Sequence, residues 1–530
     1  ERRMAKGGWH VLAVAGLLAL SLPAGPPARL SAQEPIDTAL NRQIREEGFT
    51  RSKVLETALA LSDDNGPRLA GSSNFLRAAR WAAKQMKEWG LSNAKLEPWG
   101  VHGRAWALES YSAEMTAPYY LRLAAFPRAW AGGRIFTVSG TPIVAPVSSD
   151  ADFERVKGKL RGRIVLASLA RPFRRREEPL FHRFTDAELD AMAKAPPPPG
   201  PFDFWAEYDG WANTLHQRDK IMQFFRDEGA VALLVPSPND EFLQADGWWN
   251  YAGSVTGAVP TFVVAREQYN RLVRLANKGG PFKIELSLKA HFETGDTTGF
   301  NVVAELPGTD STLAPEVVMM GGHLDSWMSG TGATDNGAGS AVVMEALRIL
   351  MAVGAKPRRT IRMALWDGEE NSADDYGGSM GYVRRHFAIP ETMQVQPEHA
   401  RLSAYLNLDN GTGRIRGIFM QGDTAASPIF RALLEPFKDL GANHVVPGNT
   451  GDTDHIPFQA VGLPGFEMLQ DPVDYERRTH HTILDVGDYL LEDDLKQASV
   501  VMASLAYHLA IRDGQVPRPP LPGPRKKREQ

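Results

Sequence analysis

The chain has 530 residues, of which 43% are hydrophobic, and a formal net charge of −4. This length favours two domains, or one domain with a large insertion, and the charge weighs against a dedicated nucleic-acid binder, which usually has a basic footprint. The chain contains no cysteine, which excludes disulfides, thiolate zinc sites and a cysteine nucleophile. Any bound metal must therefore be held by His, Asp and Glu.

The first segment has the layout of a secretory signal. Three basic residues precede an apolar run at 9–22, and proline and small residues follow up to Ala32. The run is shorter than the roughly 20 residues that cross a bilayer, which favours a cleaved signal over a short membrane anchor. Residues 1–32 are therefore predicted to be a signal peptide. The mature protein is expected to be periplasmic or secreted, with no stable membrane anchor.

Residues 36–90 are predicted to be helical, with an amphipathic helix at 77–89. From 126 to 288, short apolar runs alternate with Gly, Pro and Asp turns, which is typical of a β-rich module. A long polar segment at 171–205 interrupts this module, and its four prolines at 196–199 predict a stiff, extended loop. The Pro-rich, basic tail at 516–530 is predicted to be disordered.

Between residues 300 and 515 the pattern changes to alternating strands and helices, which indicates a layered α/β sheet. A helix is expected at 339–351 and a closing amphipathic helix at 489–512. Four buried strands are expected, at 301–306, 316–323, 360–366 and 401–409.

Candidate metal ligands follow these strands. His323 ends one strand, Glu369 and Glu370 follow the next, and Asp409 ends a third. Asp335 lies in a glycine-rich loop before the helix at 339–351. Reactive groups of open α/β sheets gather at the carboxyl ends of the strands, so these side chains are expected to lie close together.

A two-metal hydrolytic site needs one carboxylate shared by both ions. Asp335 suits that position because its glycine-rich loop allows close backbone approach. Each ion then needs one imidazole and one further carboxylate. His323 and Asp409 are assigned to one ion, and Glu370 and His481 to the other.

Two further residues have roles around this ligand set. Glu369 lies next to a ligand without being needed as one, so it is free to act as general base. Asp325, two residues after His323, can hold the second imidazole nitrogen.

Taken singly, motifs in this region are also compatible with ordinary surface or capping roles. Glu370 alone could be a solvated surface residue, and His480 could be the ligand in place of His481. The segment at 377–381 matches the Gly-x-Ser-x-Gly pattern of a serine nucleophile, but a polar loop precedes it where a buried strand is required. Ser379 is therefore expected to cap a helix.

The chain resembles the zinc exopeptidase family of bacterial leucyl aminopeptidases, glutamate carboxypeptidases and the transferrin receptor. It is most similar to the plasma glutamate carboxypeptidase (carboxypeptidase Q) branch. The resemblance covers roughly residues 50–510 and is specific in its combination of motifs. These motifs are HLDSW at 323–327, TDNGAG at 334–339, KPRRTIRMALWDGEE at 356–370, AVGLPG at 460–465 and HHTILD at 480–485.

The resemblance implies a mixed β-sheet with helices on both faces. It also implies that a protease-associated (PA) domain at 126–295 is inserted between an N-terminal part of the peptidase domain at 33–125 and its catalytic part at 296–515. It is compatible with a homodimer. Family members often have a cis peptide where this chain has Asp335–Asn336. Matched residue by residue, two Zn²⁺ would be bound by His323, Asp335, Glu370, Asp409 and His481, with Glu369 as the base.

The sequence leaves open which residues contact the substrate. Thr450 occupies the position where some aminopeptidases place an oxyanion-binding tyrosine, so zinc or His455 could serve instead. An acidic loop at 371–377 could line the substrate mouth. A free amine could be bound by Asp374, Asp375 or Glu467, and a free carboxylate by Arg414, Arg416, Arg477 or Arg478.

The function expected from the sequence is an exported di-zinc metallo-exopeptidase that acts on short peptides, as an aminopeptidase, a carboxypeptidase or a dipeptidase. Two alternatives use the same fold. One is a catalytically silent receptor or binding protein, and the other is a glutaminyl cyclase with a single zinc.

Overall fold

A computed structural model describes residues 34–198, 203–247, 257–293, 295–372 and 376–525. The predicted signal peptide and the candidates Asp374 and Asp375 lie outside these residues. Within the described part of the chain, no helix combines the length and apolarity that a membrane crossing requires.

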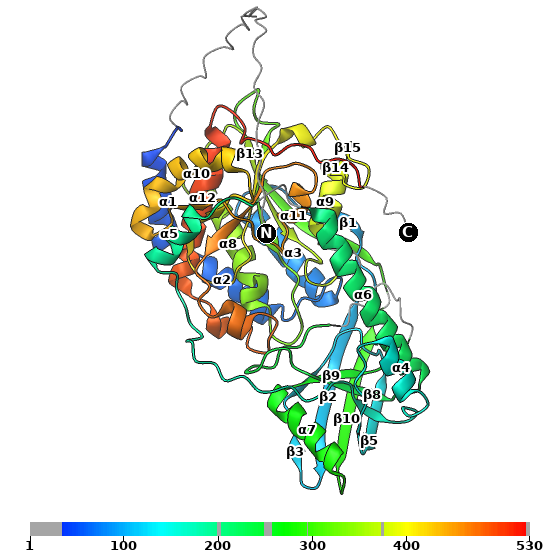
Figure 1. Cartoon of the computed structure of the whole chain (residues 1–530). Helices are drawn as coiled ribbons and strands as arrows, with labels where there is room; N and C mark the ends of the chain where they lie inside the picture. Colours follow the sequence, from blue (N-terminus) through cyan, green and yellow to red (C-terminus); the bar gives the residue numbers. More distant parts are fainter. Residues whose placement is uncertain (1–33, 199–202, 248–256, 294, 373–375, 526–530) are drawn as a thin grey trace, which may run out of the picture. The chain divides into compact units, whose positions relative to one another are not determined.

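The main structural element is a mixed sheet in the upper part of the molecule in Figure 1. Its strand order is β1-β11-β13-β12-β16-β19-β17-β18. Strands β13, β12, β16 and β19 run parallel to one another, whereas β1, β11 and β17 pair antiparallel with a neighbour. The strands are β1 (Ser92–Val101), β11 (Thr298–Leu306), β12 (Val317–His323), β13 (Thr360–Trp366), β16 (Leu402–Asn407), β17 (Ile415–Phe419), β18 (His444–Val446) and β19 (Gly465–Gln470).

Alternate residues of each strand point to opposite sides of the sheet, and apolar side chains occur on both sides. Helices cover both of these faces. In β12, Val318 and Met320 pack into one apolar cluster, and Val317 and Met319 pack into another. The first cluster includes residues of α1 (Thr38–Thr50), α2 (Val54–Leu59), α3 (Ser73–Glu88), α8 (Ala338–Ala352), α10 (Ser427–Leu434) and α12 (Glu492–Ile511). The second includes residues of α9 (Gly377–His386) and α11 (Ile456–Gln459). The predicted fold, a mixed sheet between helices, is confirmed.

The strands and helices that were expected in the main sheet and its covering layers form close to their expected bounds. Helix α3 begins four residues earlier than its pattern suggests, because the Ser72 hydroxyl accepts a hydrogen bond from the Phe75 N–H at 3.2 Å and caps the helix. Ser379 does not have the capping role expected of it. It lies inside α9, where Tyr376 is the N-cap residue.

Two smaller sheets form between β1 and β11. One is antiparallel, with the order β3-β2-β10-β5, and the other has the order β4-β9-β8-β7-β6. Strand β2 lies before residue 126, where the inserted module was expected to begin. The identity of this region as a PA domain stays a prediction. Its elements are β2 (Trp106–Ala117), β3 (Leu121–Arg122), β4 (Ala125–Pro127), β5 (Ile135–Gly140), β6 (Ile143–Val144), α4 (Asp150–Val156), β7 (Ile164–Leu166), α5 (Asp186–Lys194), α6 (Phe204–Asp227), β8 (Ala232–Pro236), β9 (Thr261–Val264), α7 (Arg266–Lys278) and β10 (Lys283–Phe292).

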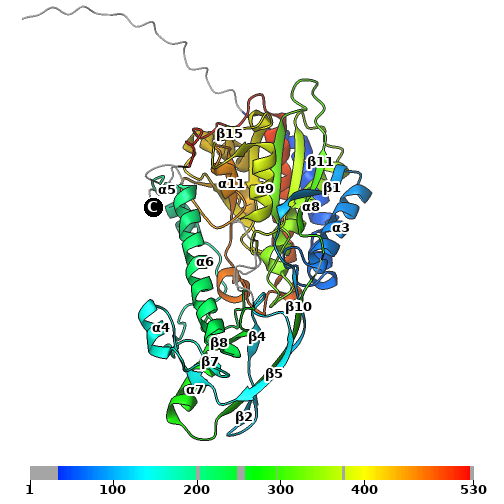
Figure 2. The same cartoon turned by 90° about the vertical axis from the view of Figure 1, so that its right-hand side faces the viewer.

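The long helix α6 was not predicted from the sequence (Figure 2). Only Phe204, Met222 and Phe225 are buried along its 24 residues, so it has no continuous apolar stripe. Its two ends pack against different partners. Phe204 contacts the cluster that contains Tyr376 and Ile456, whereas Met222 and Phe225 pack within the inserted region.

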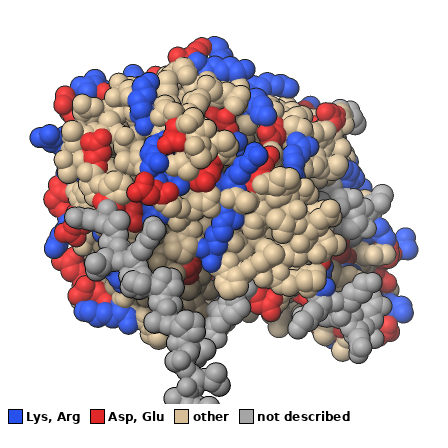
Figure 3. Space-filling model, turned by 90° about the horizontal axis from the view of Figure 1, so that it is seen from above, with Lys and Arg blue, Asp and Glu red and all other residues tan. Residues whose placement is uncertain are grey.

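Residues 516–525 differ from the expected disordered tail. Val516 is 2% exposed, and the Arg518 guanidinium donates to the carbonyls of His399 and Leu402 at 2.8 and 2.5 Å. These contacts hold the segment against residues 399–402. On the face seen in Figure 3, the described acidic and basic side chains are interspersed.

Candidate metal centre

The candidate ligands meet at the carboxyl edge of the parallel strands. His323 is the last residue of β12, Glu369 and Glu370 follow β13, and Asp409 follows β16. Asp335 lies in a turn (Ala333–Gly337) that leads into α8, and its own backbone angles are not helical. The strand order therefore brings together residues that are separated by up to 86 positions along the chain.

Asp335 lies between two histidines. Its Oδ1 is 3.4 Å from His323 Nε2, and its Oδ2 is 3.3 Å from His481 Nε2. His323 Nε2 also lies 3.2 Å from Asp409 Oδ1, and His481 Nε2 lies 2.9 Å from Glu370 Oε1. The side chains thus form two sets that share only Asp335. One set contains His323 and Asp409, and the other contains Glu370 and His481.

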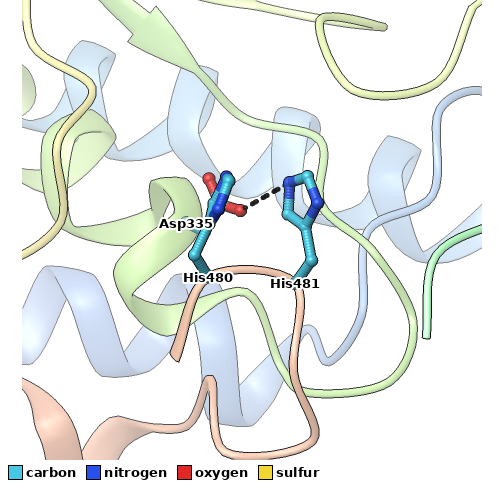
Figure 4. A group of neighbouring side chains, drawn as sticks. All are labelled: Asp335, His480 and His481. Atoms are coloured by element: carbon cyan, nitrogen blue, oxygen red, sulfur yellow. Dashed lines mark ion pairs between the residues drawn. The ribbon is translucent and has the colours of Figure 1, made fainter. Parts of the chain in front are cut away.

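Both neighbouring histidines of the 480–485 motif lie beside Asp335 (Figure 4). The ion pair runs from Asp335 to His481, whereas His480 Nδ1 lies 3.7 Å from Glu476 and its ring lies 5.0 Å from the ring of Tyr475. Asp335, His480 and His481 each offer an atom within 4.8 Å of the others. The geometry therefore favours His481, and His480 remains a second candidate.

The loop that carries Asp335 is held by a buried arginine. Arg68 is 0% exposed, and its guanidinium donates to the carbonyls of Leu324, Thr331 and Gly332 at 2.6, 2.8 and 2.7 Å. Gly332 has φ +67°, a left-handed conformation that glycine adopts without strain. The Asp335–Asn336 peptide is cis.

Two contacts to the ligands had no signal in the sequence. The Tyr475 hydroxyl donates to Asp335 Oδ1 at 2.9 Å, and Trp327 Nε1 donates to Glu370 Oε2 at 2.7 Å. Trp327 belongs to the HLDSW motif, but the motif does not show which side chain it contacts. Tyr475 lies outside every motif of the chain.

Asp325 is placed differently from the expectation. His323 Nδ1 lies 2.9 Å from the backbone oxygen of Asp325 and 3.6 Å from its carboxylate. The carboxylate instead accepts the backbone N–H groups of Glu369 and Glu370, at 3.1 and 3.2 Å. Asp325 therefore fixes the backbone of the candidate base and of its neighbouring ligand.

The donor set fits zinc. Burial raises the pKa of Glu370, and the nearby Asp335 carboxylate adds to this effect. Burial likewise raises the pKa of Glu369, beside Asp409 and Glu370. Glu370 Oε1 is buried and accepts no hydrogen bond. A bound cation would stabilise the ionised form of these crowded carboxylates, and imidazole nitrogens with carboxylate oxygens are the zinc donors that a chain without cysteine can offer.

Two of the substrate-binding candidates, His455 and Glu467, are buried and already have hydrogen-bond partners. His455 is 0% exposed, and its Nε2 donates to the backbone oxygen of Thr450 at 3.1 Å. Burial lowers the pKa of His455 to about 3, so this ring is neutral. Glu467 is buried behind Asp409, whose N–H it accepts at 2.9 Å. Asp375 lies outside the described residues.

Comparison with known proteins identifies the catalytic part. Residues 301–506 match the model of peptidase family M28. The chain carries a peptidase family M28 domain. The enzyme class expected from the sequence, a zinc-dependent metallopeptidase, is thereby confirmed.

Similar proteins cover nearly the whole chain. Carboxypeptidase Q of Mus musculus is 27% identical over 475 residues, which are 89% of this chain and 88% of that protein. The crystal structure of a peptidase M28 precursor from Shewanella amazonensis is 25% identical, with a TM-score of 0.64 over 91% of this chain and 98% of that one. A zinc aminopeptidase from Bacillus subtilis is 17% identical and shares the fold, with a TM-score of 0.55 over 87% of this chain and 95% of that one.

Proposed function

We propose that this M28 domain is a di-zinc exopeptidase that hydrolyses short peptides. The observation that carries the proposal is the position of Asp335, with one carboxylate oxygen toward His323 and the other toward His481. Asp335, Asp409, Glu369 and Glu370 would together carry four negative charges, which two divalent cations match. A single ion would leave one imidazole and one carboxylate of the site without a cation.

Five residues would hold the two ions, and a sixth would move the proton. His323 and Asp409 would hold one ion, Glu370 and His481 would hold the other, and Asp335 would be shared between them. When bound, a zinc pair polarises the substrate carbonyl and makes water a better nucleophile. Glu369 takes a proton from the attacking water and returns it to the leaving amine. Its carboxylate has an atom within 4.8 Å of atoms of His323 and Glu370, next to both ligand sets.

The end of the peptide that is trimmed depends on which terminal charge the protein binds. The four arginines considered for a substrate carboxylate all have acidic partners already. Arg416 lies 2.9 Å from Asp471, and Arg477 lies 3.1 Å from Glu178. Arg414 and Arg478 lie within 3.3 Å of Asp494 and Asp474. Carboxylate capture by any of them would therefore compete with an existing ion pair.

A substitution of the base tests the mechanism. Glu369→Gln keeps the size of the side chain and removes its ability to accept a proton, so hydrolysis should fall at least about 10²-fold while two zincs stay bound. Glu56→Gln, at an exposed position, is the control. Activity is read by mass spectrometry on dipeptides and on N- or C-blocked tripeptides, with and without a chelator. Retained activity in Glu369→Gln would contradict the proposal.

The same measurements separate the alternatives. Fewer than one zinc per wild-type chain and no hydrolysis would indicate a silent binding protein. One zinc, with cyclisation of N-terminal glutamine, would indicate a glutaminyl cyclase. The proposed export rests on the apolar run within residues 1–32, and the mass of the mature N-terminus after expression in a bacterial host tests it.

A further inference from the structure

The candidate ligand His481 has a backbone conformation that needs support. Its φ is +58°, in the left-handed region. Residues other than glycine are uncommon there, because the Cβ atom crowds the neighbouring backbone. Such a conformation persists where surrounding contacts hold it. The contacts around His481 therefore show which part of the fold holds this ligand in place.

Some of those contacts come from the inserted region, and the Ser329 hydroxyl also donates to the His481 carbonyl, at 3.4 Å. The Ala245 N–H donates to the His481 carbonyl at 3.2 Å, and the Ile483 N–H donates to the Leu243 carbonyl at 3.1 Å. Gln244 and Thr482 form an antiparallel β-bridge between these two bonds. Residues 243–245 thus pair with 481–483 as a short antiparallel ladder.

Residues 243–247 also contact Glu370, the other candidate ligand of the same metal as His481, indirectly. A Cβ atom added at Gly247 would lie 2.6 Å from the ring of Trp327 and 2.9 Å from the ring of Trp130. Trp327 in turn donates its indole N–H to Glu370 Oε2. Residues 243–247 therefore support both Glu370 and His481.

The other ligand set is held from within the main sheet. His323 Nδ1 lies against the Asp325 backbone oxygen, and the Asp409 N–H donates to Glu467 on β19. No hydrogen bond or ion pair that the structure describes joins residues 243–247 to His323 or Asp409. Asp325 also fixes the backbone of Glu370, so what distinguishes the half formed by Glu370 and His481 is its additional contact with residues 243–247.

We propose that residues 243–247 are a positioning element for the metal bound by Glu370 and His481, and not for the metal bound by His323 and Asp409. The proposal rests on the two-zinc function given above. Contact between the inserted region and the 481–483 segment then sets the affinity of one metal position. Loosening that contact should leave a protein that holds a single zinc tightly.

Backbone substitutions test this, because they leave every proposed ligand in place. Ala245→Pro removes the N–H that holds the His481 carbonyl, whereas Ala245→Gly keeps it and is the matched control. Gly247→Ala is a second variant, because its methyl group displaces Trp327. Zinc is counted by elemental analysis after dialysis, and each affinity is measured by competition with a chromophoric chelator.

In Ala245→Pro and Gly247→Ala, one zinc should keep its wild-type affinity and the other should bind about 10–100-fold more weakly. Peptidase activity should return when zinc is added in excess, which a general folding defect would not allow. Ala245→Gly should behave as wild type. Two zincs with unchanged affinity, or equal weakening of both, in a variant with a native near-UV circular dichroism spectrum would overturn the proposal. A wild-type protein that does not bind two zincs would instead contradict the proposed function itself.

Discussion

The hydroxyl of Tyr475 donates a hydrogen bond to Asp335 Oδ1 at 2.9 Å across 140 positions of the chain, and both side chains are buried. Asp335 is the one candidate ligand that both metal sets share. Tyr475→Phe removes this bond and keeps the ring, so it should lower the affinity for both zincs by about 10–100-fold. Chelator competition measures the two affinities. A loss confined to one zinc would show that Asp335 does not bridge.

The two neighbouring histidines should differ sharply when they are replaced. His481 Nε2 lies 2.9 Å from Glu370 and 3.3 Å from Asp335, whereas His480 has its closest ion pair with Glu476 at 3.7 Å. His481→Ala should remove one zinc per chain and lower kcat/KM by at least about 10²-fold. His480→Ala, the matched control, should keep two zincs. The reverse result would make His480 the ligand.

The strand ends could be predicted from the sequence because runs such as VVMMGG and MALW are apolar and are followed by polar residues. Because parallel strands present their carboxyl ends at one edge of the sheet, ligands at those strand ends could be predicted to lie together. The contacts of Trp327 and Tyr475 could not be predicted, because they depend on side-chain directions in loops far apart in sequence. Helix α6 was missed because its burial is confined to its two ends.

Ser379 should not be a nucleophile, although its neighbours match a serine-hydrolase pattern. It is 0% exposed, and its hydroxyl donates to Asp454 Oδ1 at 2.5 Å. Ser379→Ala should change kcat less than about threefold, and serine-directed phosphonates should not inhibit. The substitution leaves a buried carboxylate with one donor fewer, so the free energy of unfolding should fall by about 1–3 kcal/mol. Loss of activity without loss of zinc or stability would contradict this.

Metal removal should destabilise the fold as well as stop hydrolysis. A ligand that binds only the native state stabilises it by about 4 kcal/mol at a free concentration 1,000 times its Kd. Dialysis against a chelator should therefore lower the Tm, and added zinc should restore it in two saturable steps. Tyr475→Phe should need more zinc for both steps. A Tm that does not depend on zinc would show that the five proposed ligands do not bind it in the folded chain.

Arg68 should be essential for the loop that carries Asp335. Burial lowers its pKa to about 10, yet the hydrogen bonds of its guanidinium go to backbone carbonyls, including those of Leu324 and Gly332. Arg68→Met removes donors from the buried Leu324 and Thr331 carbonyls and one of the two donors of the Gly332 carbonyl, so it should cost about 3 kcal/mol or more in unfolding free energy. Arg68→Lys keeps the charge but lacks the planar guanidinium, so an intermediate loss is expected.

Urea unfolding of the zinc-free protein measures both losses without a contribution from the metal. Both variants should also bind zinc more weakly, because the Thr331 and Gly332 carbonyls lie just before Asp335 and lose the guanidinium that contacts both of them. Arg77→Lys, on the partly exposed face of α3, is the control. Wild-type stability in Arg68→Lys would show that charge alone, and not the hydrogen bonds to the loop, accounts for this arginine.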